Sequence, residues 1–113
     1  MDLLVIHEEG IAIVEPTARR LDAAVAPSFK QQVVALVQGG QARIVVDLRR
    51  VDFLDSSGLG ALVSILKALG GQGSLAVCGA KGSVMSLFKL TRMDKVFAIE
   101  DTRANAIRRL AGR

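Results

Sequence analysis

Cysteine and aromatic residues are scarce in this chain, and the scarcity limits what the protein can be. One of the 113 residues is cysteine, four are phenylalanine, and none is tryptophan or tyrosine. A lone cysteine forms no intrachain disulfide. Cys78 lies in the apolar run SLAVCG, where we expect a small buried side chain. So few aromatic side chains also exclude an aromatic platform for stacked bases.

Residues for metal or nucleotide chemistry are missing too. His7 is the only histidine, and together with Cys78 it offers no spacing typical of metal ligands. The chain contains no G-x-x-x-x-G-K-[ST] sequence, so a P-loop nucleotide site is unsupported. We therefore expect no metal and no cofactor.

Long apolar runs and a signal peptide are absent as well. The first residues, MDLLVIHEEG, carry acids, lack a basic segment, and contain too short an apolar run for a signal peptide. The longest apolar stretch, Leu59–Leu69, is interrupted by Ser64 and Lys67 and is shorter than the ~20 residues of a membrane span. We therefore expect a cytoplasmic protein with no membrane insertion.

Positive charge is concentrated at one end of the chain. Residues 81–113 hold eight Lys/Arg against three Asp/Glu, whereas residues 1–80 hold seven against eight. The spacing of Arg103, Arg108, Arg109 and Arg113 matches no nucleic-acid motif, so we expect a solvated helix face and no direct nucleic-acid binding. An acidic partner for this end stays open.

Hydrophobic periodicity predicts alternating strands and helices. The first two strands, over 3–7 and 11–15, form a hairpin whose turn uses Gly10 at a positive φ. The elements that follow are a helix from about Pro27 to Gly39, a buried strand over 42–48, a helix over 59–69, a strand over 74–79, a helix over 83–90 and a strand over 96–99. A last helix begins after a cap provided by Asp101 or Thr102. Its inward face consists of Ala104, Ile107, Leu110 and Ala111.

This order, β-β-α-β-α-β-α-β-α, predicts an α/β fold. We expect a single domain over residues 1–113, with a mixed, mostly parallel sheet of about five strands and about four helices packed on it. Functional loops of such sheets follow the carboxyl ends of strands. The loop Arg49–Ser57 is therefore the expected site.

The segment VDFLDSSGLG (51–60) raises the question of what its two serines do. One interpretation is a helix cap, which Asp55, Ser56 or Ser57 could provide, with Gly58 allowing a tight turn. Another is a catalytic serine, but the segment is not G-x-S-x-G, the only histidine lies in the first strand, and Lys67 lies far along the helix. We therefore expect no enzyme.

The third interpretation is a phosphate acceptor. A phosphate where a helix begins would meet the positive end of the helix dipole and free N–H groups. It would add a charge of roughly −1.5 to −2 beside Asp55. If burying that charge cost a partner ~3 kcal/mol, its affinity would fall on the order of a hundredfold.

At these residues the chain resembles a known family. The stretch IVVDLRRVDFLDSSGLGALVSILKAL resembles the signature of STAS domains, and specifically that of bacterial anti-sigma factor antagonists. RLDAAVAPSFKQQV and LFKLTRMDKVFAIEDTRANAI resemble the segment before the family's first helix and its closing helix-strand-helix segment, so the resemblance covers nearly the whole chain. Many relatives have glycine where Arg92 stands, so that helix is expected to end without a left-handed glycine.

The resemblance implies a STAS-like fold and a partner-switching function. The unphosphorylated form would bind an anti-sigma factor with serine kinase activity and so release a sigma factor. Phosphorylation of Ser57 would end that binding, and a phosphatase would reverse it. The partner-binding residues carried over from the family are Asp22, Asp55, Ser56, Gly58, Leu59 and Gly60. The alternative is a STAS assembly subunit of a transporter or lipid-trafficking complex that contacts an ATPase without a phospho-switch. The oligomeric state stays open.

Overall fold

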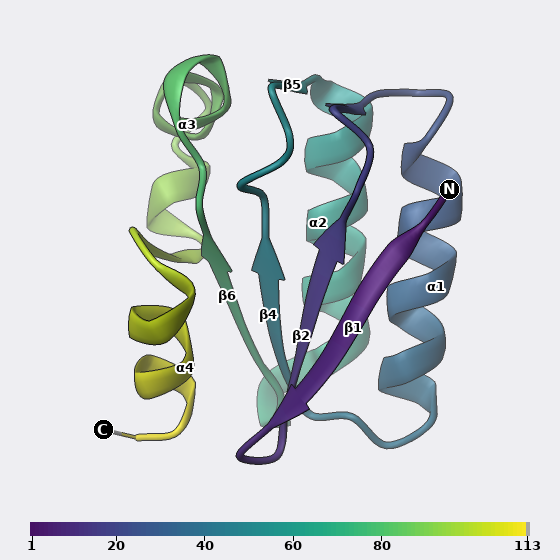
Figure 1. The fold of residues 1–113 in the computed structure, drawn as a ribbon, viewed down its shortest axis with the longest axis vertical. Helices are drawn as coiled ribbons and strands as arrows, with labels where there is room; N and C mark the ends of the chain where they lie inside the picture. Colours follow the sequence, from purple (N-terminus) through teal and green to yellow (C-terminus); the bar gives the residue numbers. More distant parts are fainter. Residues whose placement is uncertain (113) are drawn as a thin grey trace.

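The computed structural model describes residues 1–112 and confirms the predicted mixed sheet (Figure 1). Its five strands follow the order β1-β2-β4-β6-β7. β1 pairs antiparallel with β2, and all the other pairs are parallel. The strands are β1 (Leu3–Glu8), β2 (Ile11–Pro16), β4 (Arg43–Asp47), β6 (Ser74–Cys78) and β7 (Ala98–Glu100).

The β1–β2 hairpin turns through two residues, Glu9 and Gly10. Both have positive φ angles, 55° and 77°, which is the backbone of a type I′ turn. The predicted positive φ at Gly10 is confirmed, and Glu9 shares that conformation. Glu8 therefore lies opposite Ile11, and the register continues without a bulge to Leu3 opposite Pro16.

Four α-helices within residues 1–112 cover the two faces of the sheet: α1 (Ala26–Gln38), α2 (Ser56–Leu69), α3 (Gly82–Leu90) and α4 (Arg103–Leu110). Figure 1 shows α1 and α2 side by side behind the strands, with α4 on the other side near β6. Each face of the sheet has its own hydrophobic core, and alternate residues of β2 contribute to each. Ala12 and Val14 belong to the core beneath α1 and α2. Ile11 and Ile13 belong to the other core, with Ala106 and Ile107 of α4. None of these helices is long and apolar enough to cross a membrane.

Three details of the prediction are wrong. Helix α2 begins at Ser56 rather than Leu59, because Asp55 caps it. The last strand begins at Ala98, two residues later than expected, because residues 93–95 form a short 3-10 turn, η2 (Met93–Lys95). In α4, Ala104 is exposed and Ala106 is buried in its place.

Two very short strands were not predicted. β3 (Arg20–Leu21) and β5 (Phe53–Leu54) pair in parallel and form a separate two-stranded sheet. Arg20 lies opposite Phe53, and Leu21 lies opposite Leu54. This small sheet joins the segment before α1 to the segment before α2 and so connects the two halves of the site described next.

Candidate functional site

Asp55 caps α2 and sets the conformation of the serines that follow. Its Oδ1 accepts hydrogen bonds from the backbone N–H groups of Ser57 (2.9 Å) and Gly58 (3.2 Å). The backbone of Asp55 is extended, as is usual for a capping residue. Of the residues proposed as caps, Asp55 holds that position, and Ser56 and Ser57 are the first two residues of the helix.

This cap corrects one part of the phosphate hypothesis. We expected free N–H groups at the start of α2 to receive a phosphate, but the carboxylate of Asp55 already accepts from two of them. A phosphate on Ser57 would therefore lie beside a carboxylate that occupies these donors. The local environment would add repulsion, which the helix dipole offsets only in part.

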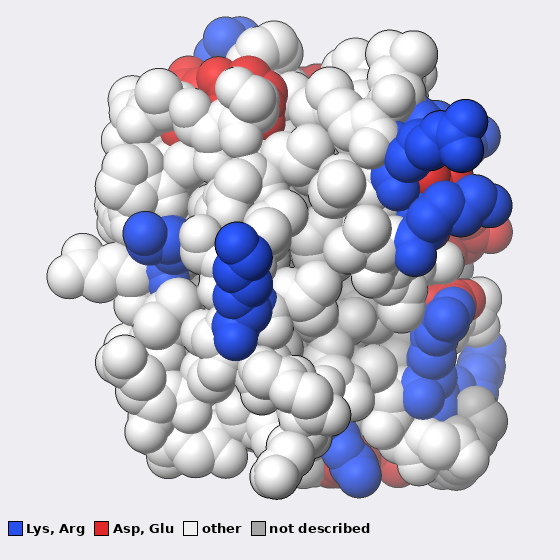
Figure 2. All heavy atoms as spheres, turned by 180° about the vertical axis from the view of Figure 1, so that it is seen from behind, with Lys and Arg blue, Asp and Glu red and all other residues white. Residues whose placement is uncertain are grey.

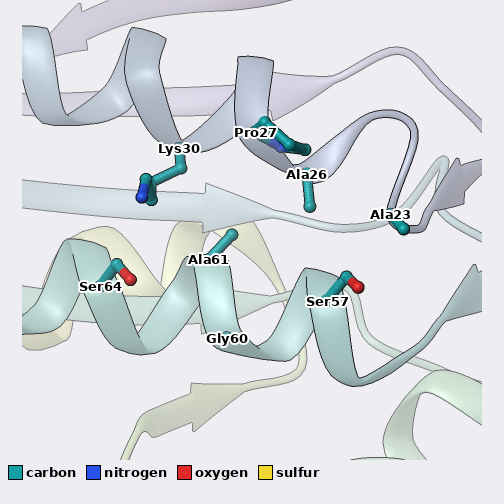
Figure 3. A pocket seen from close by; sticks show the side chains of 8 residues that line it. All are labelled: Ala23, Ala26, Pro27, Lys30, Ser57, Gly60, Ala61 and Ser64. Atoms are coloured by element: carbon teal, nitrogen blue, oxygen red, sulfur yellow. The ribbon is translucent and has the colours of Figure 1, made fainter.

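Ser57 is half-buried and lines an open groove between α1 and α2. The groove measures about 340 Å³, and mostly small side chains line it: Ala23, Ala26, Pro27, Lys30, Ser57, Gly60, Ala61 and Ser64. Figure 3 shows Ser57 at the end near Ala23, whereas Lys30 and Ser64 lie at the other end. Another protein can therefore reach Ser57, and Ser56 is more exposed still.

The two glycines of the segment have different environments. A Cβ on Gly58 would come within 2.3 Å of the carbonyl oxygen of Leu21 and 2.4 Å of Leu54 Cδ1, so only glycine fits there. Gly60 is exposed, and a Cβ there would meet nothing within 4 Å. Leu59 is 9% exposed and packs in the core. Gly58 and Leu59 were predicted to bind a partner, but both are buried, so a partner does not contact them. They pack the start of α2 against the rest of the domain.

Asp22 lies beside this segment, because β3 and β5 end together. Leu21 and Leu54 are paired, and each is followed by an aspartate, Asp22 or Asp55. The Oδ1 of Asp22 accepts from the N–H of Ala24 (3.1 Å), and its carbonyl oxygen accepts from the N–H of Val25 (3.1 Å) and of Ala26 (2.7 Å). Each aspartate therefore orders the start of one of the helices that form the groove.

Sequence reasoning missed Arg20 and Phe53, the other residues of this small sheet. The Arg20 guanidinium lies 4.1 Å from the centre of the Phe53 ring, and its Nε lies 3.4 Å from Asp22 Oδ2. Phe53 is 36% exposed. The repeated Leu-Asp pair, in RLD at 20–22 and FLD at 53–55, is the signal that could have indicated the pairing.

Charge is distributed unevenly over the face formed by α1 and α2. Figure 2 shows a largely uncharged surface with separate Lys/Arg side chains on it, and with Asp/Glu atoms next to Lys/Arg atoms at its upper end. Lys and Arg gather along the far edge, on the side of α3 and α4. A partner at the groove therefore meets mostly small uncharged residues, with Lys30 at one end and the paired Arg20 and Asp22 near the other.

A second charged cluster, not predicted, lies at the start of α4, beside the carboxyl ends of β2 and β4. Glu15 and Asp47 are each 2% exposed. Arg50 Nε lies 2.7 Å from Glu15 Oε2, and Arg49 NH2 lies 3.1 Å from Glu15 Oε1. Arg103 bonds both carboxylates, with its Nε 3.0 Å from Asp47 Oδ2. Its side chain is 24% exposed, so Arg103 does not belong to the solvated helix face we expected, and Arg113 lies outside the described residues.

This cluster changes the ionisation of its members and of the nearby thiol. Burial by itself would raise the pKa of Glu15, but the hydrogen bond from Arg49 and the charges of Arg49, Arg103 and Arg50 outweigh it and hold that pKa below its ordinary value. Burial, aided by Asp47, raises the pKa of the Cys78 thiol to about 12. Cys78 is 0% exposed, which confirms the predicted buried side chain.

Comparison with known proteins places this architecture in a family. Residues 3–106 match the STAS domain. This chain belongs to the STAS domain family. The match includes the Asp55 cap, both serines and the two short strands, so the segment around the groove lies inside the family's domain.

Proteins similar to this STAS domain carry related names. An anti-sigma F factor antagonist of Paenibacillus polymyxa is 30% identical over 106 residues, which cover 92% of this chain and 90% of that protein. The crystal structure of an anti-sigma factor antagonist from Mycobacterium paratuberculosis has a TM-score of 0.89 at 28% identity and covers 96% of this chain and 92% of that one. An anti-sigma-factor antagonist (STAS) domain protein from Planctomyces limnophilus has a TM-score of 0.85 at 25% identity, with 96% of each chain covered.

Proposed function

We propose that this STAS domain is an anti-sigma factor antagonist whose binding is switched off by phosphorylation of Ser57. The observation that carries the proposal is the position of Ser57, half-buried in the first turn of α2 and lining an open groove beside the Asp55 cap. The names of its relatives support the partner class, an anti-sigma factor. The kinase activity of that partner, and the phosphatase that reverses the modification, are parts of the same proposal.

The unphosphorylated groove suits close packing against a protein. Small residues line it, so a partner's side chains can approach both helix backbones. Ser56 and Gly60 are exposed beside it, and Asp22 and Asp55 lie at the end where the helices begin. These four residues, with Ser57, form the proposed docking surface: Ser56, Ser57, Gly60, Asp22 and Asp55.

A phosphate would change this surface by its charge. It adds roughly −1.5 to −2 at neutral pH. Asp55 holds its negative charge next to Ser57 and uses it to cap the helix. Lys30, the cation of the groove, lies at the opposite end, as Figure 3 shows. A partner packed over Ser57 would bury this negative charge, and the nearby Arg20 is already paired with Asp22, so burial weakens binding while the fold stays the same.

Phosphorylation itself is tested with the anti-sigma factor kinase of the same organism and ATP. Phos-tag electrophoresis should show a shifted band for the wild type and for Ser56→Ala, and no shifted band for Ser57→Ala. Ser56→Ala is the matched control because the two serines are neighbours in one helical turn. Full modification of Ser57→Ala would rule out Ser57 as the acceptor.

The consequence for binding is tested by calorimetry with the same anti-sigma factor. Ser57→Asp should bind it at least about tenfold more weakly than the wild type, a loss of about 1.4 kcal/mol. Ser56→Asp, one residue further from the groove lining, should lose less. Equal binding by Ser57→Asp and the wild type would contradict the switch. If the protein instead binds a transporter ATPase, and the Ser57→Asp variant binds it as tightly as the wild type does, the assembly-subunit alternative is favoured.

A further inference from the structure

The exposed edge of the main sheet suggests a second interface, independent of the proposed function. We propose that β1 pairs with β1 of a second copy of this chain, antiparallel and with Val5 opposite Val5. The two five-stranded sheets would then join into one continuous sheet. The inference depends on the exposure of β1, on the direction of its backbone groups and on its sequence.

β1 is an apolar edge strand whose charges, Asp2 and Glu8, stand only at its two ends. It is the first strand of the order β1-β2-β4-β6-β7, and β2 is its only strand partner within residues 1–112. Three consecutive large side chains are exposed, Leu4 by 43%, Val5 by 38% and Ile6 by 44%. The strand LLVIHE contains no Lys or Pro, and its register shows no bulge. Natural edge strands carry such features to prevent pairing with other chains.

The hairpin turn decides which backbone groups of β1 face outward. In a two-residue turn the flanking residues, Glu8 and Ile11, form a hydrogen-bonded pair. Hydrogen-bonded and non-hydrogen-bonded pairs alternate along two antiparallel strands, so the backbone groups of Ile6 and Leu4 also form hydrogen bonds with β2. The bond from Thr17 N–H to the carbonyl oxygen of Asp2 (3.2 Å) continues this even-numbered series. The N–H and C=O groups of Leu3, Val5 and His7 consequently point away from the sheet.

One register satisfies these outward groups and covers the apolar side chains together. With Val5 on the two-fold axis, each Val5 exchanges both hydrogen bonds with its equivalent, and Leu3 pairs with His7 of the other copy. Leu4 then lies opposite Ile6 of the other copy in a non-hydrogen-bonded pair, the type with closer side chains. A register centred on Leu3 or His7 would leave at least one of these apolar residues unpaired.

A second copy fits this edge because the strand is complementary to itself. Each copy supplies an apolar residue for every exposed apolar residue of the other, and the pairing uses up the edge, so assembly stops at two. The opposite edge, β7, is only three residues long. At the ends of the pairing Glu8 falls opposite Asp2 of the other copy, so salt should strengthen the dimer by screening this repulsion.

The proposed dimer leaves the docking surface open. A two-fold axis between antiparallel strands is perpendicular to the sheet, so both copies keep α1 and α2 on the same face of the joined sheet. The groove with Ser57 lies between α1 and α2, away from the paired strands. Loss of the β1 contact would therefore leave the phosphorylation of Ser57 unchanged, which separates a failure of this inference from a failure of the proposed function.

Sedimentation velocity of the wild type, from low micromolar to near-millimolar concentration, tests the pairing. We expect a reversible monomer–dimer equilibrium that shifts toward dimer as salt is added. Ile6→Lys should raise the dissociation constant by roughly tenfold or more, because it places a charge in the paired strand. Val5→Pro should do the same by removing the N–H group on the axis, and proline is tolerated where an edge N–H faces solvent.

Leu90→Lys is the matched control. Leu90 is the most exposed large apolar residue, at 82%, and lies at the end of α3, so its substitution should leave the dimer intact. Amide exchange of Leu3, Val5 and His7 should slow as concentration rises. A wild type that stays monomeric throughout, or a dimer that survives both Ile6→Lys and Val5→Pro in folded protein, would overturn the inference.

Discussion

Gly58 of α2 lies against the backbone of Leu21, so closely that a Cβ on Gly58 would come within 2.3 Å of the Leu21 carbonyl oxygen. This contact joins the start of α2 to β3. It also explains why the small residues of this segment differ in function, because Gly58 serves packing whereas Gly60 borders the open groove.

Substitution of Gly58 is therefore predicted to destabilise the protein. Gly58→Ala should lower the free energy of unfolding by about 3 kcal/mol, because the atoms it meets include backbone that moves little. Gly60→Ala should instead raise it by about 1 kcal/mol, since alanine favours a helix and its methyl group meets open space. Urea denaturation of both variants measures this difference, and similar stabilities would show that the close contact is absent.

The cap of α2 gives a second prediction. Asp55→Ala should lower the free energy of unfolding by about 1 kcal/mol, because the N–H groups of Ser57 and Gly58 lose their acceptor. Asp55→Asn retains a side-chain oxygen and should be close to the wild type. Amide exchange at Ser57 and Gly58 should accelerate in Asp55→Ala alone. Unchanged exchange there would mean that Asp55 does not cap the helix.

Arg92 adopts a conformation that glycine favours. Its φ of 59° and ψ of 20° lie in the left-handed region, and it follows Thr91, the C-cap of α3. Arg92→Gly should therefore raise the free energy of unfolding by about 0.5–1 kcal/mol. Glycine relieves the strain of the left-handed backbone, but it also increases the conformational entropy of the unfolded chain, which reduces the gain. Arg92→Ala keeps the strain and should show no gain. Thermal denaturation distinguishes the two, and an equal gain in both would implicate the arginine side chain instead.

The buried cluster around Glu15 predicts a dependence of stability on pH. The pKa of Glu15 is lower in the folded protein than in the unfolded chain. The ionised carboxylate therefore stabilises the fold at every pH above the pKa of Glu15 in the unfolded chain. That contribution should be lost as pH falls below the ordinary value of 4.5 and through the lowered folded pKa. Urea denaturation across this acidic range should show the loss in the wild type and a smaller one in Glu15→Gln.

At neutral pH the same substitution should be costly. Glu15→Gln removes the buried carboxylate that three arginines share and leaves Asp47 as the remaining partner of Arg49 and Arg103, so it should lower the free energy of unfolding by about 3 kcal/mol. Asp52→Asn is the control, because Asp52 pairs with Arg19 where the two side chains are 49% and 81% exposed, and an exposed pair contributes less than about 1 kcal/mol. Equal losses in the two variants would show that burial of Glu15 has no special effect.

Much of this protein follows from its sequence by itself, because the signals are local. The period of apolar residues predicted every strand of the main sheet and all four helices, and turn chemistry predicted the hairpin at Gly10. The segment 51–60, after a buried strand and before a helix, indicated where the site would lie. The Asp55 cap and the half-buried Ser57 lie in that segment, whereas half of the residues that line the groove come from 23–30.

Only the tertiary structure decided which distant residues meet. β3 and β5 have two residues each, too few for a periodic signal, yet their pairing brings Asp22 beside Asp55. Glu15 and Arg103 are 88 residues apart, and no local pattern reveals that Arg103, at the start of α4, reaches the carboxyl ends of β2 and β4. The direction of α4 also buries Ala106 and exposes Ala104. Local backbone preference selects the elements, whereas the packing of one element on another selects the side chains that share a site.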